Sequence, residues 1–227
     1  MDPIKALNFN GPISSVANWN AWAPPELQNR LPFRPTVRGL SQVNDPSEWG
    51  IIYPATSTLS YTISTSQNAQ VSITAEEAAE LWREKMVPLR REKGKKLVGP
   101  GCASDKAGEK WLKEFMERLC ELGEPPDYLG LPYYHGTGWE HEEYPEYPIV
   151  VSEIARVCRA PKEVFKFPAQ VANWIDECPW IFEYAFFGCM AKVADDFVSP
   201  EPQLMNSDGS FKHLMKKLMN EQPMTEA

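Results

Sequence analysis

The sequence predicts an α/β protein, an abbreviated (β/α)8 TIM-like barrel, and three observations support this fold class. Strand-like apolar runs alternate with amphipathic helical segments, which is typical of βα units. Strands are predicted at residues 16–20, 36–41, 59–65, 95–99, 128–134, 148–153 and 180–187, and a short run at 49–53 is a candidate eighth. The chain has 227 residues. A typical barrel has roughly 250, so at least one peripheral helix must be missing.

Two connections are too short or too polar for a full set of crossover helices. Residues 42–48 are expected to form only a loop, and residues 135–147 are polar and interrupted by Gly and Pro. A doubly wound open sheet is the alternative fold, but the sequence has no Gly-rich phosphate loop to support it. We expect a single domain over residues 1–227, with loose termini at 1–12 and 221–227.

The helices have clearer boundary signals. Thr74 and Glu77 have the spacing of a capping box, so a helix is predicted to begin at Thr74. Ser104 is expected to cap the next helix, which Gly123 should end. A third helix is predicted over residues 161–178, with a kink at Pro168. The last is predicted over residues 210–220.

Composition and charge exclude some classes of partner. The formal net charge is −8, which argues against nucleic acid because phosphate binding requires a basic surface. No apolar run of about 18 residues exists, so no membrane span is predicted. The first residues do not open a signal peptide, because no apolar segment follows them. The sequence leaves the localisation open.

Glu153 is the most informative single residue. It follows a short β-branched apolar run at residues 149–151, which is typical of a buried strand in a parallel sheet. In parallel barrels the catalytic residues lie at the carboxyl ends of the strands. Glu153 is therefore a candidate nucleophile. The alternative is a structural Glu held in an ion pair.

Aromatic residues gather at the ends of several predicted strands. The chain contains eight Trp, eight Tyr and ten Phe. The apolar C–H face of a sugar ring packs well on such side chains, although each one taken alone is more often part of a core. The candidates for a sugar-binding cleft are Trp19, Trp22, Tyr133, Tyr134, Tyr184 and Phe187.

A metal site is a weaker alternative. His135, His141, Glu142 and Glu143 carry possible ligands, but their spacing matches no pair on one helix face. We therefore predict no metal and no cofactor.

Several segments, in this order along the chain, carry a resemblance to a known family. They are residues 18–22 (NWNAW), 74–82 (TAEEAAELW), 98–104 (VGPGCAS), 111–115 (WLKEF), 127–134 (DYLGLPYY), 151–155 (VSEIA) and 183–187 (EYAFF). Together they resemble glycoside hydrolase family 128, the fungal alkali-sensitive-linkage type of glycosyl hydrolase catalytic core. The resemblance extends from about residue 13 to residue 222.

The resemblance implies an α/β barrel, retaining hydrolysis of β-1,3-glucan, and no metal. It assigns the nucleophile to Glu153, and it makes a β-glucan polysaccharide or oligosaccharide the expected partner. Members of this family are often secreted or associated with the fungal cell wall.

The sequence departs from the family at the acid/base residue. The family carries an Asn-Glu-Pro motif just before the helix that begins here at Thr74, and its Glu falls on Gln67, within about two residues. No Asp or Glu lies between Glu48 and Glu76, so a small register change does not restore a carboxylate. A second departure is Pro132, where the family has His before the paired Tyr.

Two hypotheses follow from these features. The first is a retaining β-1,3-glucan hydrolase with Glu153 as nucleophile and a weakened or replaced proton donor. The second is a barrel that binds β-glucan without efficient hydrolysis, because general acid catalysis is worth about 10²–10⁴-fold. Glu183, near the start of the last predicted strand, is a further carboxylate to check near Glu153.

Overall fold

Parallel strands form the centre of the molecule. The computed structural model describes residues 11–17, 23, 25, 31–37, 39–54, 59–63, 73–102, 106–135, 149–156, 166–179, 181–186, 189, 203–221 and 223–225. Three sheets occur in this part of the chain, and all their strand pairs are parallel. They are β1 (Val16–Ala17) with β2 (Phe33–Arg34), then β3 (Thr36–Val37), β4 (Leu59–Ile63) and β5 (Lys96–Gly101), then β6 (Leu129–His135), β7 (Ile149–Arg156) and β8 (Ile181–Phe186).

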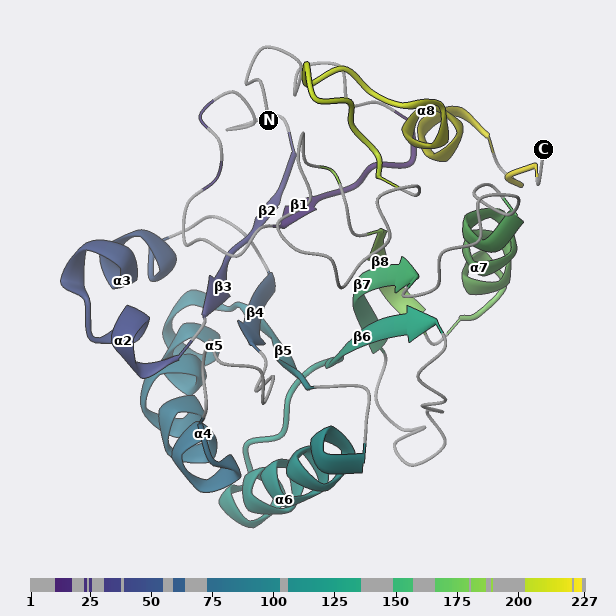
Figure 1. The fold of residues 1–227 in the computed structure, drawn as a ribbon. Helices are drawn as coiled ribbons and strands as arrows, with labels where there is room; N and C mark the ends of the chain where they lie inside the picture. Colours follow the sequence, from purple (N-terminus) through teal and green to yellow (C-terminus); the bar gives the residue numbers. More distant parts are fainter. Residues whose placement is uncertain are drawn as a thin grey trace.

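The sheets follow one another in chain order. β2 contacts β4, and a parallel bridge between Val98 and Tyr128 joins β5 to the residue before β6. Gly130 allows these two strands to come close, since a Cβ there would lie 2.3 Å from the carbonyl oxygen of Gly99. Figure 1 shows the strands at the centre and the helices outside them. The predicted mixed α/β class is therefore confirmed.

The helices lie outside the strands in two groups. Figure 1 places α2 to α6 around β3, β4 and β5, and α7 and α8 on the other side, beyond β6 to β8. Their bounds are α2 Leu40–Val43, α3 Pro46–Ile52, α4 Ala75–Leu81, α5 Val87–Lys93, α6 Lys106–Leu122, α7 Lys166–Asp176 and α8 His213–Asn220. No helix among the described residues is long and apolar enough to cross a membrane.

The capping box predicted at Thr74 is confirmed. The Glu77 backbone N–H donates to the Thr74 hydroxyl, and the Thr74 N–H donates to the Glu77 carboxylate at 2.9 Å. The helix continues through a π-helical turn, Trp82–Met86, into α5. Pro88 lies in the first turn of α5. Because proline has no N–H and its ring clashes with the preceding turn, the wider π turn lets the chain pass it without ending the helix.

Two predictions for residues 36–53 were wrong. Residues 49–53 are not an eighth strand, because Trp49 lies within α3, and the expected loop at 42–48 contains parts of α2 and α3. Asp45 caps α3 by accepting from the Ser47 N–H at 2.8 Å, and Pro46 occupies its first turn. Local capping therefore outweighs the strand preference of this short apolar run. The strand predicted at 36–41 ends at Val37.

The later helices agree with the sequence more closely. α6 ends at Leu122, and Gly123 adopts φ 68°, the left-handed conformation that glycine tolerates best. In α7, Pro168 is the third described residue, and the kink predicted there stays a prediction because the residues before Lys166 lie outside the described part of the chain. Ser104 and residues 157–165 lie outside the described residues.

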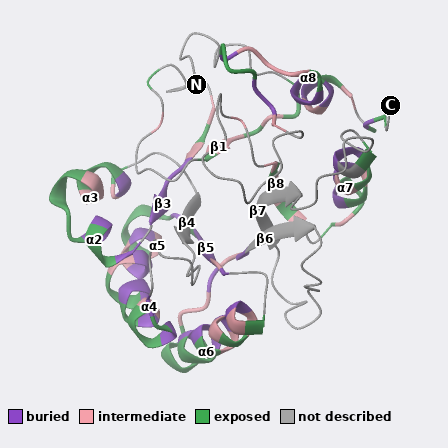
Figure 2. Cartoon of the chain, in the orientation of Figure 1, coloured by how far each residue is buried: buried purple, intermediate pink, exposed green. Residues whose placement is uncertain are grey.

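The described residues form two apolar cores (Figure 2). The larger core packs α4, α5 and α6 on β3, β5 and β6, with Trp82, Phe115, Leu97 and Leu129 almost fully buried. The smaller core joins α7 and α8 to the chain's last residues. Its buried members are Ala169, Leu204, Leu214, Met215, Met219 and Met224.

The tail after α8 is held in place, which corrects the expectation of a loose end for the described residues from Glu221 to Thr225. Met224 is buried, and its backbone N–H and C=O bond the side-chain amide of Asn173 at 2.7 and 2.9 Å. The buried Lys217 ammonium also donates to the Glu221 carboxylate and to Thr225. A buried side chain and paired backbone groups fix a terminus that composition alone marks as loose.

Candidate active site

β7 carries the candidate nucleophile. The strand runs from Ile149 to Arg156 between β6 and β8, so Glu153 lies within it. The prediction that the strand ends at Glu153 was wrong, because pairing with β6 continues for three more residues, to Arg156 opposite His135. The candidate nucleophile thus lies on a strand that is paired on both sides.

The pairing of β7 is interrupted just before Glu153. On the β6 side, Leu131 pairs with Val151 and Pro132 pairs with Glu153, so Ser152 has no partner in this ladder. On the β8 side, Val151 pairs with Tyr184 and Ile154 with Phe186. Both neighbours therefore place one extra residue in β7 at this level, which is a β-bulge.

A second irregularity fixes the position of Glu183 in β8. Ile149 pairs with Ile181 and Val150 with Glu183, so Phe182 is an extra residue. Phe182 is 53% exposed, and its ring lies 4.6 Å from that of Tyr128, centroid to centroid. Glu183 stands opposite Val150, before the level of Glu153.

Glu183 belongs to a buried polar cluster. Its carboxylate accepts from Arg34 Nε at 3.3 Å, from Arg34 Nη2 at 3.4 Å and from the hydroxyl of Ser15. The side chains of Arg34 and Glu183 are only 9% and 11% exposed. Ser15 precedes β1 and Arg34 ends β2, so the cluster joins the last strand to the first two.

Tyr184, a predicted sugar contact, has structural neighbours. Its hydroxyl donates to Asp176 of α7 at 3.2 Å, and its ring meets Phe186 edge to face at 6.0 Å. Burial, assisted by the Asp176 carboxylate, raises the pKa of the Tyr184 hydroxyl well above its usual value. Tyr184 therefore packs toward α7. Its predicted role in binding a sugar stays a prediction.

The other predicted site residues are placed only in part. β4 ends at Ile63, which pairs with Gly101. Gln67 lies four residues further on, outside the described part of the chain, as do Trp19, Trp22 and Phe187. Tyr133 and Tyr134 lie in β6 and pair with Ile154 and Ala155 of β7.

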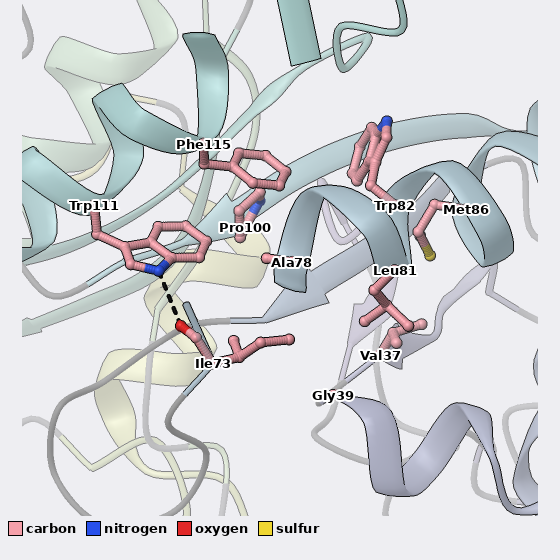
Figure 3. A pocket seen from close by; sticks show the side chains of 10 residues that line it. All are labelled: Val37, Gly39, Ile73, Ala78, Leu81, Trp82, Met86, Pro100, Trp111 and Phe115. Carbon is pink, nitrogen blue, oxygen red and sulfur yellow. Dashed lines mark hydrogen bonds between the residues drawn. The ribbon is translucent and has the colours of Figure 1, made fainter. Parts of the chain in front are cut away.

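The cavity in Figure 3 has neither the size nor the polar lining of a sugar-binding site. Its volume is about 20 Å³, and it lies among apolar residues such as Leu81, Trp82 and Phe115. The Trp111 indole N–H at its edge already donates to the Ile73 carbonyl at 3.0 Å, the hydrogen bond that Figure 3 marks with a dashed line. A space of this size holds at most one water and offers it few polar partners. It is a packing void between the α4 and α6 helices and the strands.

The described residues contain no group of three or more potential metal ligands. Of the alternative metal set, the structure describes His135 as part of β6, whereas His141, Glu142 and Glu143 lie outside the described residues. The metal-site alternative therefore gains no support from this part of the chain.

Comparison with known proteins identifies the family. The model of the glycosyl hydrolase catalytic core matches residues 3–217. An exo-β-1,3-glucanase of glycoside hydrolase family 128, subgroup VI, from Aureobasidium namibiae is 42% identical with a TM-score of 0.90, over 99% of this chain and 92% of that enzyme. The chain belongs to glycoside hydrolase family 128. The family 128 resemblance deduced from the ordered motifs is thus confirmed.

Two more distant family 128 structures share the fold. A subgroup V exo-β-1,3-glucanase from Cryptococcus neoformans is 23% identical with a TM-score of 0.79, over 96% of this chain and 92% of that one. A curdlan-specific subgroup III exo-β-1,3-glucanase from Blastomyces gilchristii, solved with glucose, is 17% identical with a TM-score of 0.70, over 97% and 95%. No curated protein matches the sequence.

Proposed function

We propose that this family 128 protein acts on β-1,3-glucan by a retaining mechanism, with Glu153 as the nucleophile. The observation that carries the proposal is the 42% identity, over 99% of the chain, to an exo-β-1,3-glucanase. The position of Glu153 on a doubly paired parallel strand supports it. The same similarity favours exo action, in which glucose or a short oligosaccharide leaves from a chain end.

The three sheets are proposed to close into an abbreviated (β/α)8-type barrel. Support comes from the links between successive sheets, β2 with β4 and β5 with β6. The Ser15–Glu183 and Arg34–Glu183 contacts provide the corresponding link between the last strand and the first two. In such a barrel the site lies at the carboxyl ends of the strands, where β6, β7 and β8 would present it.

The mechanism begins with attack of the Glu153 carboxylate on the anomeric carbon. The bond from that carbon to the leaving oxygen breaks, and a covalent glycosyl–enzyme ester forms. A second carboxyl group, roughly 5–5.5 Å away, would protonate the leaving oxygen and then activate a water. In this chain the corresponding segment has Gln67, whose amide has no labile acidic proton. The leaving alkoxide therefore departs with little assistance.

The position of the missing acid has a second candidate. Catalytic groups in parallel barrels occupy strand ends, and Ile63, four residues before Gln67, is the last described residue of β4. Ile63 stands level with Gly101 at the end of β5. We therefore place the acid/base position at Gln67 or at Ile63, and neither residue is a carboxylic acid.

The alternative function is a glucan-binding protein with little turnover. It is favoured by the absence of any Asp or Glu between Glu48 and Glu76. Both functions use the same sugar-binding aromatics. Of these, Tyr134 shares its register level with Ala155 of β7, beyond Glu153, and is our first choice for a cleft residue. Trp19, Trp22, Tyr133, Tyr184 and Phe187 remain further candidates.

Substrates that differ only in leaving group separate the two functions. A dinitrophenyl β-glucoside needs no proton donor, whereas laminaritriose does. We expect measurable glycosylation from the aryl substrate, acceleration by azide as an external nucleophile, and slow hydrolysis of laminaritriose. Gln67→Glu or Ile63→Glu should raise laminaritriose hydrolysis by about 10²-fold or more, and the responsive position identifies the acid/base site.

Glu153→Gln is the control for the nucleophile. It should abolish turnover of both substrates while laminaritriose binding, measured by calorimetry, persists. Equal rates for Glu153→Gln and the wild type would refute the nucleophile assignment. Rapid laminaritriose hydrolysis by the wild type would refute the binding-only alternative and would require a proton donor from another part of the chain.

A further inference from the structure

The two faces of the β6–β7–β8 sheet have different surroundings. Ile181 and Tyr184 of β8 pack on the larger core, and Phe186 packs on both cores. In β6, Leu129 is fully buried in the larger core. These residues pair with Ile149, Val151 and Ile154 of β7. We call this side of the sheet the helix-side face.

The opposite face is occupied by different residues. Glu183 reaches Arg34 and Ser15 from it. Ala185 follows two residues later in β8, between Tyr184 and Phe186, and is exposed. Because side chains alternate along a strand, Ala185 lies on the same face as Glu183. We call this side of the sheet, which is exposed at Ala185, the open face.

Regular alternation would assign Glu153 to the wrong face. Val151 pairs with Tyr184, so it occupies a helix-side position, and residue 153 of a regular strand would share that face. A carboxylate there would lie against the apolar core, at a large desolvation cost. The extra residue, Ser152, changes this alternation of faces along β7. With Ser152 unpaired, Glu153 takes the next register position, opposite Pro132, and Ile154 returns to the helix-side face opposite Phe186.

We infer that the one-residue bulge at Ser152 keeps Glu153 on the open face: because the ladder passes over Ser152, Glu153 takes the register position that follows Val151. The inference rests on the proposed function for the reaction itself, but its geometry is independent of turnover. Bulges interrupt ladder hydrogen bonds, and they are over-represented beside active sites, where they redirect a side chain. Here the bulge is seen from both neighbouring strands, one residue before the candidate nucleophile.

Two changes of chain length by one residue test this inference. Deleting Ser152 removes the bulge but leaves Glu153 opposite Pro132, on the open face. Inserting a second serine after Ser152 moves Glu153 by one position, toward the helix-side face. We expect the deletion to retain the rate of covalent labelling by a 2-deoxy-2-fluoroglucosyl fluoride within about 10-fold, and the insertion to lower it at least 100-fold. Ser152→Ala should label at the wild-type rate, because the role belongs to the backbone.

A second measurement does not need catalysis. Glu153→Cys is made in the wild-type and the insertion backgrounds, and alkylation at residue 153 by iodoacetamide is followed by peptide mass mapping. We expect rapid alkylation in the first and at least 10-fold slower alkylation in the second, with circular dichroism confirming that both fold. If the insertion variant does not fold, the double exchange Ser152→Glu with Glu153→Ser replaces it, because it keeps the chain length. This exchange should abolish fluorosugar labelling.

The outcomes separate this inference from the proposed function. Equal labelling of the folded deletion and insertion variants, or a sugar label on residue 152 of the exchange variant, would overturn the role of the bulge. If Glu153→Gln labels or turns over like the wild type, the nucleophile assignment fails. The alkylation rates then still decide whether the bulge places residue 153 on the open face.

Discussion

The helix layer over β5, made of α4, α5 and α6, and the sheet of β6, β7 and β8 differ in what lies at their strands, although register shifts occur in both regions. In the helix layer, polar groups are paired around Asp127, just before β6. Its carboxylate accepts from Arg90 Nε at 3.1 Å, from Lys96 Nζ at 2.9 Å and from the Leu97 N–H at 2.9 Å. In the β6–β8 sheet, by contrast, two bulges interrupt the ladders, and one of them adjoins Glu153.

The difference follows the direction of the strands. Asp127 lies at the amino ends of β5 and β6, which in the proposed barrel is the end associated with stability. The bulge at Ser152 lies further along, toward the carboxyl ends. Local rules tend to be broken where function requires it. Substitutions in the helix layer are therefore expected to act mainly on stability, and changes at the bulge beside Glu153 mainly on the rate.

The largest expected effect on stability is found by replacing one phenylalanine with alanine in each of the two regions. Phe115 is 1% exposed and packs against Trp82 and Trp111, with ring centroids 5.9 and 5.3 Å away. Phe115→Ala should lower the free energy of unfolding by about 3–5 kcal/mol. Phe182→Ala, at the exposed bulge of β8, should cost less than about 1 kcal/mol. Urea denaturation at pH 7 measures both, and similar losses would contradict the division into two regions.

The next effect tests the cluster that joins β8 to β1 and β2. Glu183→Ala leaves the guanidinium of Arg34 buried without this carboxylate, and should cost about 3 kcal/mol. The double variant Arg34→Met with Glu183→Leu should recover part of that loss, because no buried charge is left behind. Urea denaturation of the single and double variants gives the coupling. A Glu183→Ala variant of wild-type stability would show that the cluster does not hold the strands together.

Part of this architecture could be predicted from the sequence and part could not. The capping box at Thr74 and the helix end at Gly123 could be predicted because each depends on residues only a few positions apart. Residues 49–53 were a candidate strand because of their apolar run, but most of them lie in α3, for which Asp45 and Pro46 carried the opposing capping signal. The strands of residues 59–63 and 129–134 were predicted, but their pairing was not.

The candidate site shows the same limit. Glu153 was predicted as a candidate nucleophile from a short apolar run and from the order of the family motifs. The bulge at Ser152 has no compositional signal, since it depends on a comparison with the residues of β6 and β8. The Arg34–Glu183 contact joins residues 149 positions apart. Contacts of this range arise from the closure of the fold rather than from local preference.

The pH dependence of stability provides a smaller effect that belongs to the helix layer. Burial alone would raise the pKa of Asp127, but the Leu97 N–H, Lys96 and Arg90 outweigh it and hold the pKa below its usual value. A lowered pKa in the folded state gives stability that is present above the unfolded value of about 3.9 and is lost as the pH falls through the folded value. Asp127→Asn should cost about 1–2 kcal/mol at pH 7.

Urea denaturation between pH 7 and pH 3 checks this sign. The wild type should lose stability more steeply than Asp127→Asn as the pH falls, so the difference between the two proteins should narrow. A difference between the wild type and Asp127→Asn that stays constant or widens toward pH 3 would mean that the ionised Asp127 does not stabilise the helix layer.

The smallest effect is local to one helix end. Thr74→Ala removes the acceptor of the Glu77 N–H and should cost about 1 kcal/mol, whereas Thr74→Ser should keep most of the cap. Because α4 begins after the segment that contains Gln67, a loosened cap could also disturb the proposed acid/base position. Measuring kcat for an aryl glucoside and for laminaritriose separates the two consequences. A loss confined to stability would assign the cap to the helix layer alone, and a fall in kcat on either substrate would connect it to the geometry of the site.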